Sequence, residues 1–264
     1  MKLINGNEFT KMAAFYLDEH ILGGGLTKEL LGKDAIIFCK IDYIFRLFDF
    51  IRFSNKRYIL VTHNSDFPVD AFRFNSRPSC IKKWFGQNVV IDHPDLINIP
   101  IGLENEIRRN GTPIVDYPWF YENMNRLQNK EKISKVYCNW SPTNESRNHI
   151  VRLLEPNNIP FDLEPERLSH KEYCEKLSDY KYVLCPPGNG VSTHRFWETL
   201  YLGSIPIVLN HRIYRDYTLP IIRLNRWDNL TNEILSKFDE YKFSWEMIDF
   251  NYWETFISNE YKKL

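Results

Sequence analysis

Short hydrophobic runs alternate with stretches of helical periodicity along the first third of the chain. Four runs rich in β-branched and aromatic residues predict buried strands, at residues 34–39, 58–62, 89–91 and 97–101. Three stretches predict helices, at residues 7–20, 43–53 and 79–85. Strands that alternate with helices in this way indicate parallel βαβ units.

The alternation restarts after residues 111–135, which are polar and contain Pro, as is typical of a linker or an exposed crossing helix. Beyond this stretch the pattern predicts strands at residues 135–139, 182–185, 205–209 and 221–224. It predicts helices at residues 146–154, 170–178 and 193–202, and in parts of 231–264. This second series has the layout of half of a doubly wound architecture.

We therefore predict an α/β fold with two Rossmann-like domains that face each other across a cleft, residues 1–128 and 129–240. Residues 241–264 are expected to form a C-terminal helical segment that packs back across the seam onto the N-terminal domain. The side chains available for this packing are Trp245, Phe250, Trp253 and Phe256.

Composition narrows the range of functions. Thirty-four Lys and Arg residues balance 34 Asp and Glu residues, so bulk charge gives no reason to expect a nucleic-acid partner. The five cysteines are scattered without a C-x-x-C pair, which predicts neither a zinc site nor a disulfide framework and favours the cytoplasm. No run approaches the roughly 18 apolar residues of a membrane span, so no transmembrane segment is expected.

The segment at residues 180–208 is the most informative part of the sequence. A hydrophobic strand ends at Pro186 and Pro187, because proline cannot continue a hydrogen-bonded ladder. Gly188, Asn189 and Gly190 then allow a sharp turn, and glycine permits a close approach of the backbone to a ligand.

A helix is expected to follow this turn, capped by Ser192 or Thr193 and carrying His194, Arg195 and Glu198 in its first turns. Free N–H groups at a helix N-terminus and a fork-shaped guanidinium together suit a diphosphate. Glu198 lies one turn after Arg195 on the same face, where it can accept hydrogen bonds from ribose hydroxyls. The alternative is a surface ion pair between Arg195 and Glu198 beside an ordinary turn.

This segment resembles the C-terminal signature of exostosin-type glycosyltransferases (glycosyltransferase family 47). The resemblance is carried by residues 182–188, Arg195, Glu198, Leu200, Gly203 and residues 205–208. It implies a GT-B fold, an acceptor-binding N-terminal domain, a C-terminal domain that binds a nucleotide-sugar donor, and UDP as the nucleotide. It also implies inverting transfer to a saccharide acceptor without a catalytic metal or a cofactor other than the donor substrate. A retaining GT-B enzyme and a non-catalytic nucleotide-sugar or carbohydrate-binding module stay open as alternatives.

Inverting transfer needs a general base to take the proton from the acceptor hydroxyl. Asp66 is the first candidate, because it follows the strand at residues 58–62 at its carboxyl end, the edge where α/β proteins bind ligands. His63, Asp70 and Glu104 are the next candidates. The alternative for Asp66 is a turn cap before Pro68.

Other polar residues follow strands on the same ligand-binding edges. Asn64, Ser65, Gly102 and Glu104 are predicted to bind the acceptor. Ser141 and Arg147 follow the first strand of the second domain, where the alternatives are contact with the donor diphosphate and a simple helix cap with a solvated arginine. The histidines show no metal-ligand spacing, so no metal site is predicted.

Overall fold

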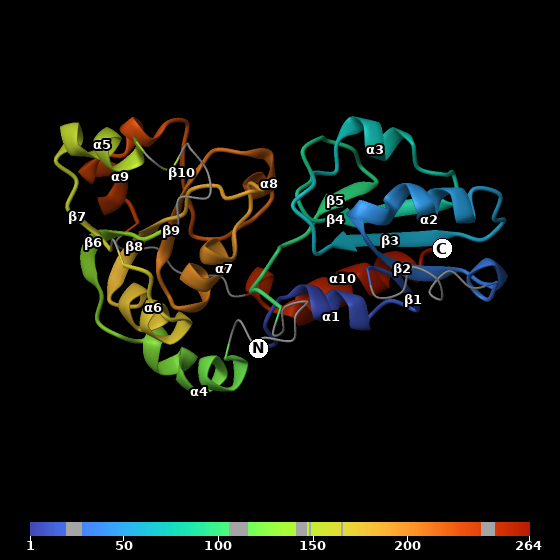
Figure 1. Ribbon diagram of the computed structural model, residues 1–264, viewed down its shortest axis with the longest axis horizontal. Helices are drawn as coiled ribbons and strands as arrows, with labels where there is room; N and C mark the ends of the chain where they lie inside the picture. The colour runs from blue at the N-terminus through green and yellow to red at the C-terminus, as the bar shows by residue number, and fades with distance from the viewer. Residues whose placement is uncertain (20–27, 106–115, 141–146, 148, 165, 239–245) are drawn as a thin grey trace. The chain divides into compact units, whose positions relative to one another are not determined.

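The structure is a computed structural model that describes residues 1–19, 28–105, 116–140, 147, 149–164, 166–238 and 246–264. Its contacts divide the chain into two compact units. Unit 1 comprises Met1–Ile101 and Asp249–Leu264, and unit 2 comprises Gly102–Ile248. Each unit is an α/β structure built on a five-stranded, all-parallel sheet (Figure 1).

The sheet of unit 1 has the strand order β1-β2-β3-β4-β5. Its strands are β1 (Phe15–Leu17), β2 (Ala35–Lys40), β3 (Tyr58–His63), β4 (Ile81–Gly86) and β5 (Leu96–Asn98). Its helices are α1 (Gly6–Lys11), α2 (Ile44–Ile51), α3 (Ala71–Asn75) and α10 (Phe250–Tyr261), with short 3-10 turns η1 (Leu30–Gly32) and η2 (Ile41–Tyr43). Every residue of β2 and β3 is buried, as expected for a parallel sheet that is covered on both faces.

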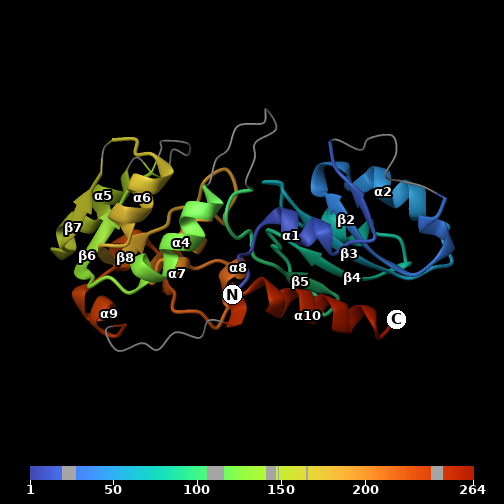
Figure 2. The same ribbon diagram turned by 90° about the horizontal axis from the view of Figure 1, so that it is seen from below.

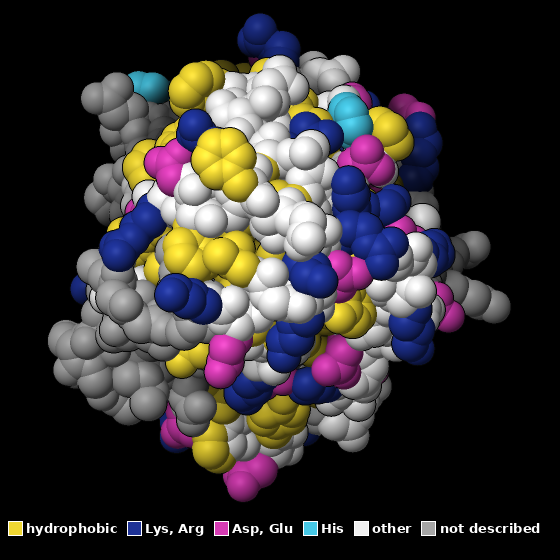
Figure 3. All heavy atoms as spheres, turned by 90° about the vertical axis from the view of Figure 1, so that its right-hand side faces the viewer, with side chains coloured by type: hydrophobic (Ala, Val, Ile, Leu, Met, Phe, Trp, Pro, Cys, Tyr) yellow, Lys and Arg dark blue, Asp and Glu magenta, His cyan; other side chains and the backbone are white. Residues whose placement is uncertain are grey.

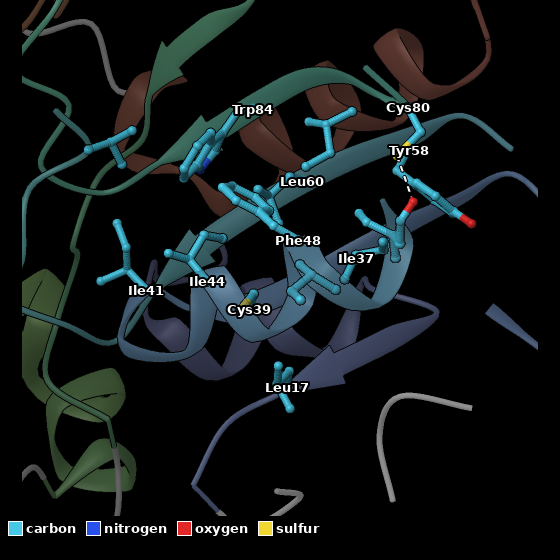
Figure 4. Close-up of a cluster of buried hydrophobic side chains, with 14 of the residues drawn as sticks. Leu17, Ile37, Cys39, Ile41, Ile44, Phe48, Tyr58, Leu60, Cys80 and Trp84 are labelled. Atoms are coloured by element: carbon cyan, nitrogen blue, oxygen red, sulfur yellow. Dashed lines mark hydrogen bonds between the residues drawn. The ribbon is translucent and has the colours of Figure 1, made fainter. Parts of the chain in front are cut away.

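Helices α2 and α3 lie on one face of this sheet and α1 and α10 on the other (Figures 1 and 2). The apolar stripe of α2 packs on alternate residues of β2 and β3, such as Ile37 and Leu60, and on Trp84 (Figure 4). On the opposite face, the Phe9 ring of α1 lies 5.2 Å from the ring of His63 and 5.0 Å from that of Phe250. The C-terminal helix is therefore part of the core of unit 1.

The helix expected at residues 79–85 is wrong, because most of this segment forms strand β4. The buried residues Ile81, Trp84 and Phe85 are three and four positions apart, which resembles helical spacing. The segment nevertheless pairs with β3 on one side and β5 on the other, and the Trp84 indole donates to Thr62 Oγ1 at 2.8 Å. Sheet pairing therefore overrides the local pattern.

Two further differences concern short edge elements of unit 1. The stretch expected to be one helix at residues 7–20 contains α1 and then the edge strand β1. The strand expected at residues 89–91 is reduced to an isolated bridge between Val69 and Val89.

Unit 2 has the strand order β10-β9-β8-β6-β7. Its strands are β6 (Ile133–Cys138), β7 (Phe161–Leu163), β8 (Tyr180–Leu184), β9 (Ile205–Leu209) and β10 (Ile222–Leu224). Its longer helices are α4 (Tyr117–Gln128), α6 (His170–Leu177) and α7 (His194–Tyr201). Shorter helical segments are α5 (Ile150–Leu154), η4 (Glu155–Asn157), α8 (Arg212–Arg215), η5 (Trp227–Asn229), α9 (Asn232–Ser236) and η6 (Glu246–Ile248).

The strand order of unit 2 reverses between β6 and β8. The chain leaves β6 for the edge strand β7, returns to β8 on the other side of β6, and continues outward to β9 and β10. Such a reversal is a topological switch point, where open α/β sheets bind ligands at the carboxyl ends of the strands. The strictly sequential sheet of unit 1 has no reversal of this kind among its described strands.

The division of the chain differs from the boundary expected at residue 128. Helix α4 belongs to unit 2, where Arg126 forms an ion pair with Glu175 of α6, and the nearby Lys130 forms ion pairs with Glu175 and Asp179. The C-terminal part of unit 1 begins at Asp249, whose carboxylate accepts from the backbone N–H of Lys2 at 3.0 Å. Within the described parts of the chain, no helix has both the length and the apolar character needed to cross a membrane.

Candidate functional site

The carboxyl ends of β6 and β8 bring several predicted residues together at the switch point of unit 2. Asn139 follows β6, and residues 186–193 connect β8 to α7. In this connection the N–H of Gly188 donates to the carbonyl oxygen of Gly190 at 3.0 Å, which closes the expected turn. Asn189 is exposed at its tip.

Arg147 holds this turn in place. Its Nε donates to the carbonyl oxygen of Pro187 at 2.8 Å, and its Nη2 donates to that of Pro186 at 3.2 Å. A Cβ atom at Gly188 would lie 3.2 Å from Arg147 Nη2, so glycine lets the guanidinium pack against the backbone. Burial lowers the pKa of Arg147 below its ordinary value, and the nearby charge of Arg195 lowers it further. The expected diphosphate contact is thus a buried residue that supports the loop.

The N-terminus of α7 has no side-chain cap from its N-cap residue. Thr193 occupies the N-cap position with extended backbone angles, yet its side chain forms no capping hydrogen bond. Its Oγ1 is buried and has no hydrogen-bond partner among the described residues. The threonine at the N-cap of α9, Thr231, accepts from the N–H of Ile234 at 3.2 Å. The first turn of α7 therefore lacks the side-chain acceptor that such residues normally supply.

Arg195 lies in the first turn of α7 without an ion-pair partner in the described part of the chain. Its Nη2 lies 3.5 Å from Asn139 Oδ1, and its buried Nε has no hydrogen-bond partner there. Burial acts to lower the pKa of Arg195, but Tyr173, Cys185 and Glu198 outweigh it and raise the pKa. The guanidinium is therefore a cation that no carboxylate of the described residues contacts directly.

Glu198 pairs with a histidine of the neighbouring helix and not with Arg195. Its Oε1 lies 3.2 Å from Nε2 of His170, at the start of α6, and its side chain is 9% exposed. Burial acts to raise the pKa of Glu198, but the hydrogen bond and charge of His170 and the charges of His194 and Arg195 hold it below its ordinary value. These contacts replace the surface Arg195–Glu198 pair that was the alternative interpretation.

His194 connects two other predicted residues to this helix. Its Nδ1 lies 2.8 Å from the carbonyl oxygen of Gly102, and its Nε2 lies 3.4 Å from Glu104 Oε2. Gly102 and Glu104 were expected to bind the acceptor in the N-terminal domain, but they belong to unit 2. Ser192 precedes the N-cap and is partly buried, and Ser141 lies outside the described residues.

The candidate base residues lie at the carboxyl end of β3 and after it, in unit 1, where two of them are held by local hydrogen bonds. His63 Nε2 lies 3.1 Å from the carbonyl oxygen of Pro100, and Nδ1 lies 2.8 Å from the backbone nitrogen and 2.9 Å from Oδ1 of Asn64. Asp70 is the N-cap of α3, and its two oxygens accept from the backbone and guanidinium of Arg73.

Asp66 is exposed, and the loop around it is tied to the sheet through its backbone. Gln87 Nε2 donates to the carbonyl oxygen of Ser65 at 3.0 Å, and Asn88 Nδ2 lies 3.5 Å from the carbonyl oxygens of Ser65 and Asp66. The turn is closed by Ser65 Oγ, which accepts from the N–H of Phe67 at 3.3 Å. The turn-capping role considered for Asp66 is thus performed by Ser65, and the Asp66 carboxylate faces solvent.

Sequence reasoning missed the contribution of α6 to this site. His170 pairs with Glu198, and the ring of Tyr173 lies under the guanidinium of Arg195, with Cζ 5.7 Å from the ring centroid. The sequence predicted the helix at residues 170–178, but no motif marked which of its residues would contact α7.

Among the residues that the structure describes, no group of three or more His, Cys, Asp and Glu side chains is arranged to hold a metal ion. All five cysteines are free and buried. The chain matches no known protein-family model.

Proposed function

We propose that this chain is a nucleotide-sugar-dependent glycosyltransferase with GT-B architecture, related to the exostosin-type enzymes that its sequence resembles. In this proposal a nucleoside diphosphate, with UDP as the expected nucleotide, binds at the N-terminus of α7. One observation carries the proposal: at the switch point of unit 2, Arg195 is a cation without an ion-pair partner among the described residues, beside a helix whose N-cap threonine forms no cap.

The charges of the site suit a diphosphate bonded to a ribose. Arg195 and the N–H groups of α7 are hydrogen-bond donors, and donors are what phosphate oxygens require. The nearby charge of Arg147 adds positive potential. Glu198, kept ionised by its surroundings, supplies an acceptor for ribose hydroxyls one helical turn away.

The reaction we propose is inverting transfer of a hexosyl or pentosyl group to a saccharide acceptor, without a catalytic metal. Asp66 takes the acceptor proton in this mechanism, since its carboxylate is exposed while His63 and Asp70 are engaged in local hydrogen bonds. Cytoplasmic location is part of the same proposal, supported by the five unpaired cysteines.

A non-catalytic nucleotide-sugar-binding module is the second candidate. It is favoured by the engagement of His63 and Asp70 in hydrogen bonds that stabilise their own loops. The two candidates differ in turnover, because a binding module releases no nucleotide.

The experiment that tests the proposal incubates the protein with a panel of nucleotide sugars and saccharide acceptors and measures the release of free nucleotide. Acceptor-dependent release of UDP that persists in EDTA is the expected result. Binding without release would support the module, and inactivation by EDTA with recovery on addition of Mn²⁺ would contradict the metal-independent mechanism. Failure to bind any nucleotide sugar would overturn both candidates.

A further inference from the structure

Buried polar atoms without partners concentrate near α7. Six buried side-chain nitrogen or oxygen atoms have no hydrogen-bond partner within the described ranges, and five of them belong to unit 2. The five residues are Tyr137, Tyr173, Thr193, Arg195 and Trp197. Buried polar groups are almost always hydrogen-bonded in native proteins, so such a concentration requires an explanation.

Helix α6 presents two residues to α7 in a matched arrangement. His170 and Tyr173 are three positions apart on α6, and Arg195 and Glu198 are three positions apart on α7. Residues at this spacing lie on one face of a helix. His170 contacts Glu198 at 3.2 Å, and the Tyr173 ring faces the guanidinium of Arg195 at 5.7 Å. One face of α6 therefore meets the face of α7 that carries both predicted nucleotide-binding side chains.

These contacts determine how the two side chains of α7 are held. Since no carboxylate pairs with Arg195 among the described residues, the Tyr173 side chain and the long contact with Asn139 are what orient its guanidinium. A guanidinium over an aromatic face is attracted electrostatically and keeps its N–H groups for another acceptor. The Tyr173 side chain is itself nine-tenths buried, and burial raises the pKa of its hydroxyl well above the ordinary value, so the ring stays neutral.

We propose that His170 and Tyr173 are the positioning residues of the nucleotide site, His170 for the ribose-binding Glu198 and Tyr173 for the phosphate-binding Arg195. The inference rests on the proposed function and deepens it. It assigns the recognition of ribose and of phosphate to two separate pairs of side chains, each linking α6 to α7. Substitution of His170 should therefore weaken the binding of the ribose, and substitution of Tyr173 should weaken the binding of the diphosphate.

The test measures the affinities of UDP, 2′-deoxy-UDP and inorganic pyrophosphate by calorimetry for wild type, His170→Leu and Tyr173→Leu. His170→Leu should weaken the affinity for UDP about tenfold and that for 2′-deoxy-UDP much less. The reason is that the hydrogen bond from the ribose hydroxyl to Glu198 depends on where His170 holds the carboxylate. Tyr173→Leu should weaken the affinity for all three ligands by a similar factor of about 3 to 30, which is the range expected for the loss of a cation–π contact. Tyr173→Phe retains the ring and should keep affinity within about twofold.

Two controls separate positioning from general damage to the fold. Lys176→Ala changes an exposed residue of the same helix and should leave all three affinities unchanged. Tyr173→Leu introduced into Arg195→Ala should cause no further loss, because coupled residues are not additive. Additive losses of affinity in the double variant would overturn the inference while leaving the proposed function intact. Equal losses of affinity for UDP and 2′-deoxy-UDP in His170→Leu would do the same. Wild-type protein that binds none of the three ligands would overturn both.

Discussion

Glu198 combines burial with a negative charge, which costs free energy unless nearby donors or cations compensate it. His170 provides a hydrogen bond at 3.2 Å, and His194 and Arg195 add positive charge. Arg195 shows the opposite situation, because its cation has no carboxylate within ion-pair distance in the described part of the chain. Glu198 is thus compensated by its neighbours, whereas Arg195 lacks an anionic partner among the described residues. In the proposed function a nucleoside diphosphate supplies that partner.

Glu198→Ala should therefore weaken the affinity for UDP more than the affinity for 2′-deoxy-UDP. The proposed partner of Glu198 is a ribose hydroxyl, and a hydrogen bond to a charged group contributes about 1.5–3 kcal/mol. Calorimetric titration of the variant with both nucleotides measures the difference directly. Equal losses for the two nucleotides would remove Glu198 from the ribose site.

Asp66→Asn should lower kcat by about 10²–10⁴-fold and leave donor affinity near that of wild type, because a general base acts on the acceptor proton. The exposed carboxylate makes a loss of stability unexpected. Asp70→Ala is the matched control, since Asp70 caps α3 and its removal should cost about 0.5–2 kcal/mol of stability without a comparable loss of kcat. If Asp66→Asn destabilises the fold and also loses donor affinity, the residue is structural.

The two ends of helix α7 differ in their hydrogen bonding. At its C-terminus, Gly203 adopts φ +73°, and the ammonium group of Lys132 donates to the carbonyl oxygens of Leu202 and Ser178 at 2.8 and 2.7 Å. Burial lowers the pKa of Lys132 to about 8. At its N-terminus, Thr193 forms no cap. Lys132 thus contacts the C-terminal end of the helix, whereas the Thr193 side chain does not cap its N-terminal end.

Gly203→Ala should lower stability by about 1–3 kcal/mol, because the left-handed backbone is strained for alanine. The new Cβ would also lie 2.8 Å from the carbonyl oxygen of Gln128. Gly32→Ala is the control, since a Cβ there meets no atom within 4 Å, and it should not destabilise the protein. Urea unfolding of both variants gives the comparison, and equal stabilities would contradict the role assigned to Gly203.

The sequence predicted α7 and the strands around it well, because each contains a local signal. Proline ends β8, glycines follow it, and Gly203 ends α7. The strand β4 was missed because Ile81, Trp84 and Phe85 follow a helical spacing, and only pairing with β3 and β5 decides the outcome. The roles of His170 and Tyr173 could not be predicted because they arise from contact between two helices that are distant along the chain.

Two parallel sheets organise the whole molecule, and each has its own hydrophobic core. In unit 1 the C-terminal helix α10 covers the other face of the sheet from α2, and its Phe250 N–H donates to the carbonyl oxygen of Lys2 at 2.8 Å. Basic, acidic and hydrophobic side chains are interspersed on the face seen in Figure 3, in keeping with the balanced composition. The parallel α/β layout was predicted from hydrophobic spacing, whereas the strand orders depend on long-range pairing that spacing does not encode.

Phe250→Ala should destabilise unit 1 by about 3–5 kcal/mol, because the side chain is fully buried against Phe9. Hydrogen exchange monitored by mass spectrometry should then show lost protection in β3 and retained protection in β8. Phe53→Ala, at a side chain that is 93% exposed, should change neither. Unchanged protection of β3 in Phe250→Ala would contradict the place of α10 in the core of unit 1.

In the proposed function, Arg195 and the N-terminus of α7 bind the diphosphate of a nucleotide sugar. The most direct test is calorimetric titration of UDP into wild-type protein and Arg195→Ala. Wild type should bind UDP, and the substitution should weaken binding by about 1.5–3 kcal/mol, roughly 10- to 150-fold in Kd. Equal affinities in the two proteins, or no binding of UDP by wild type, would contradict the proposal.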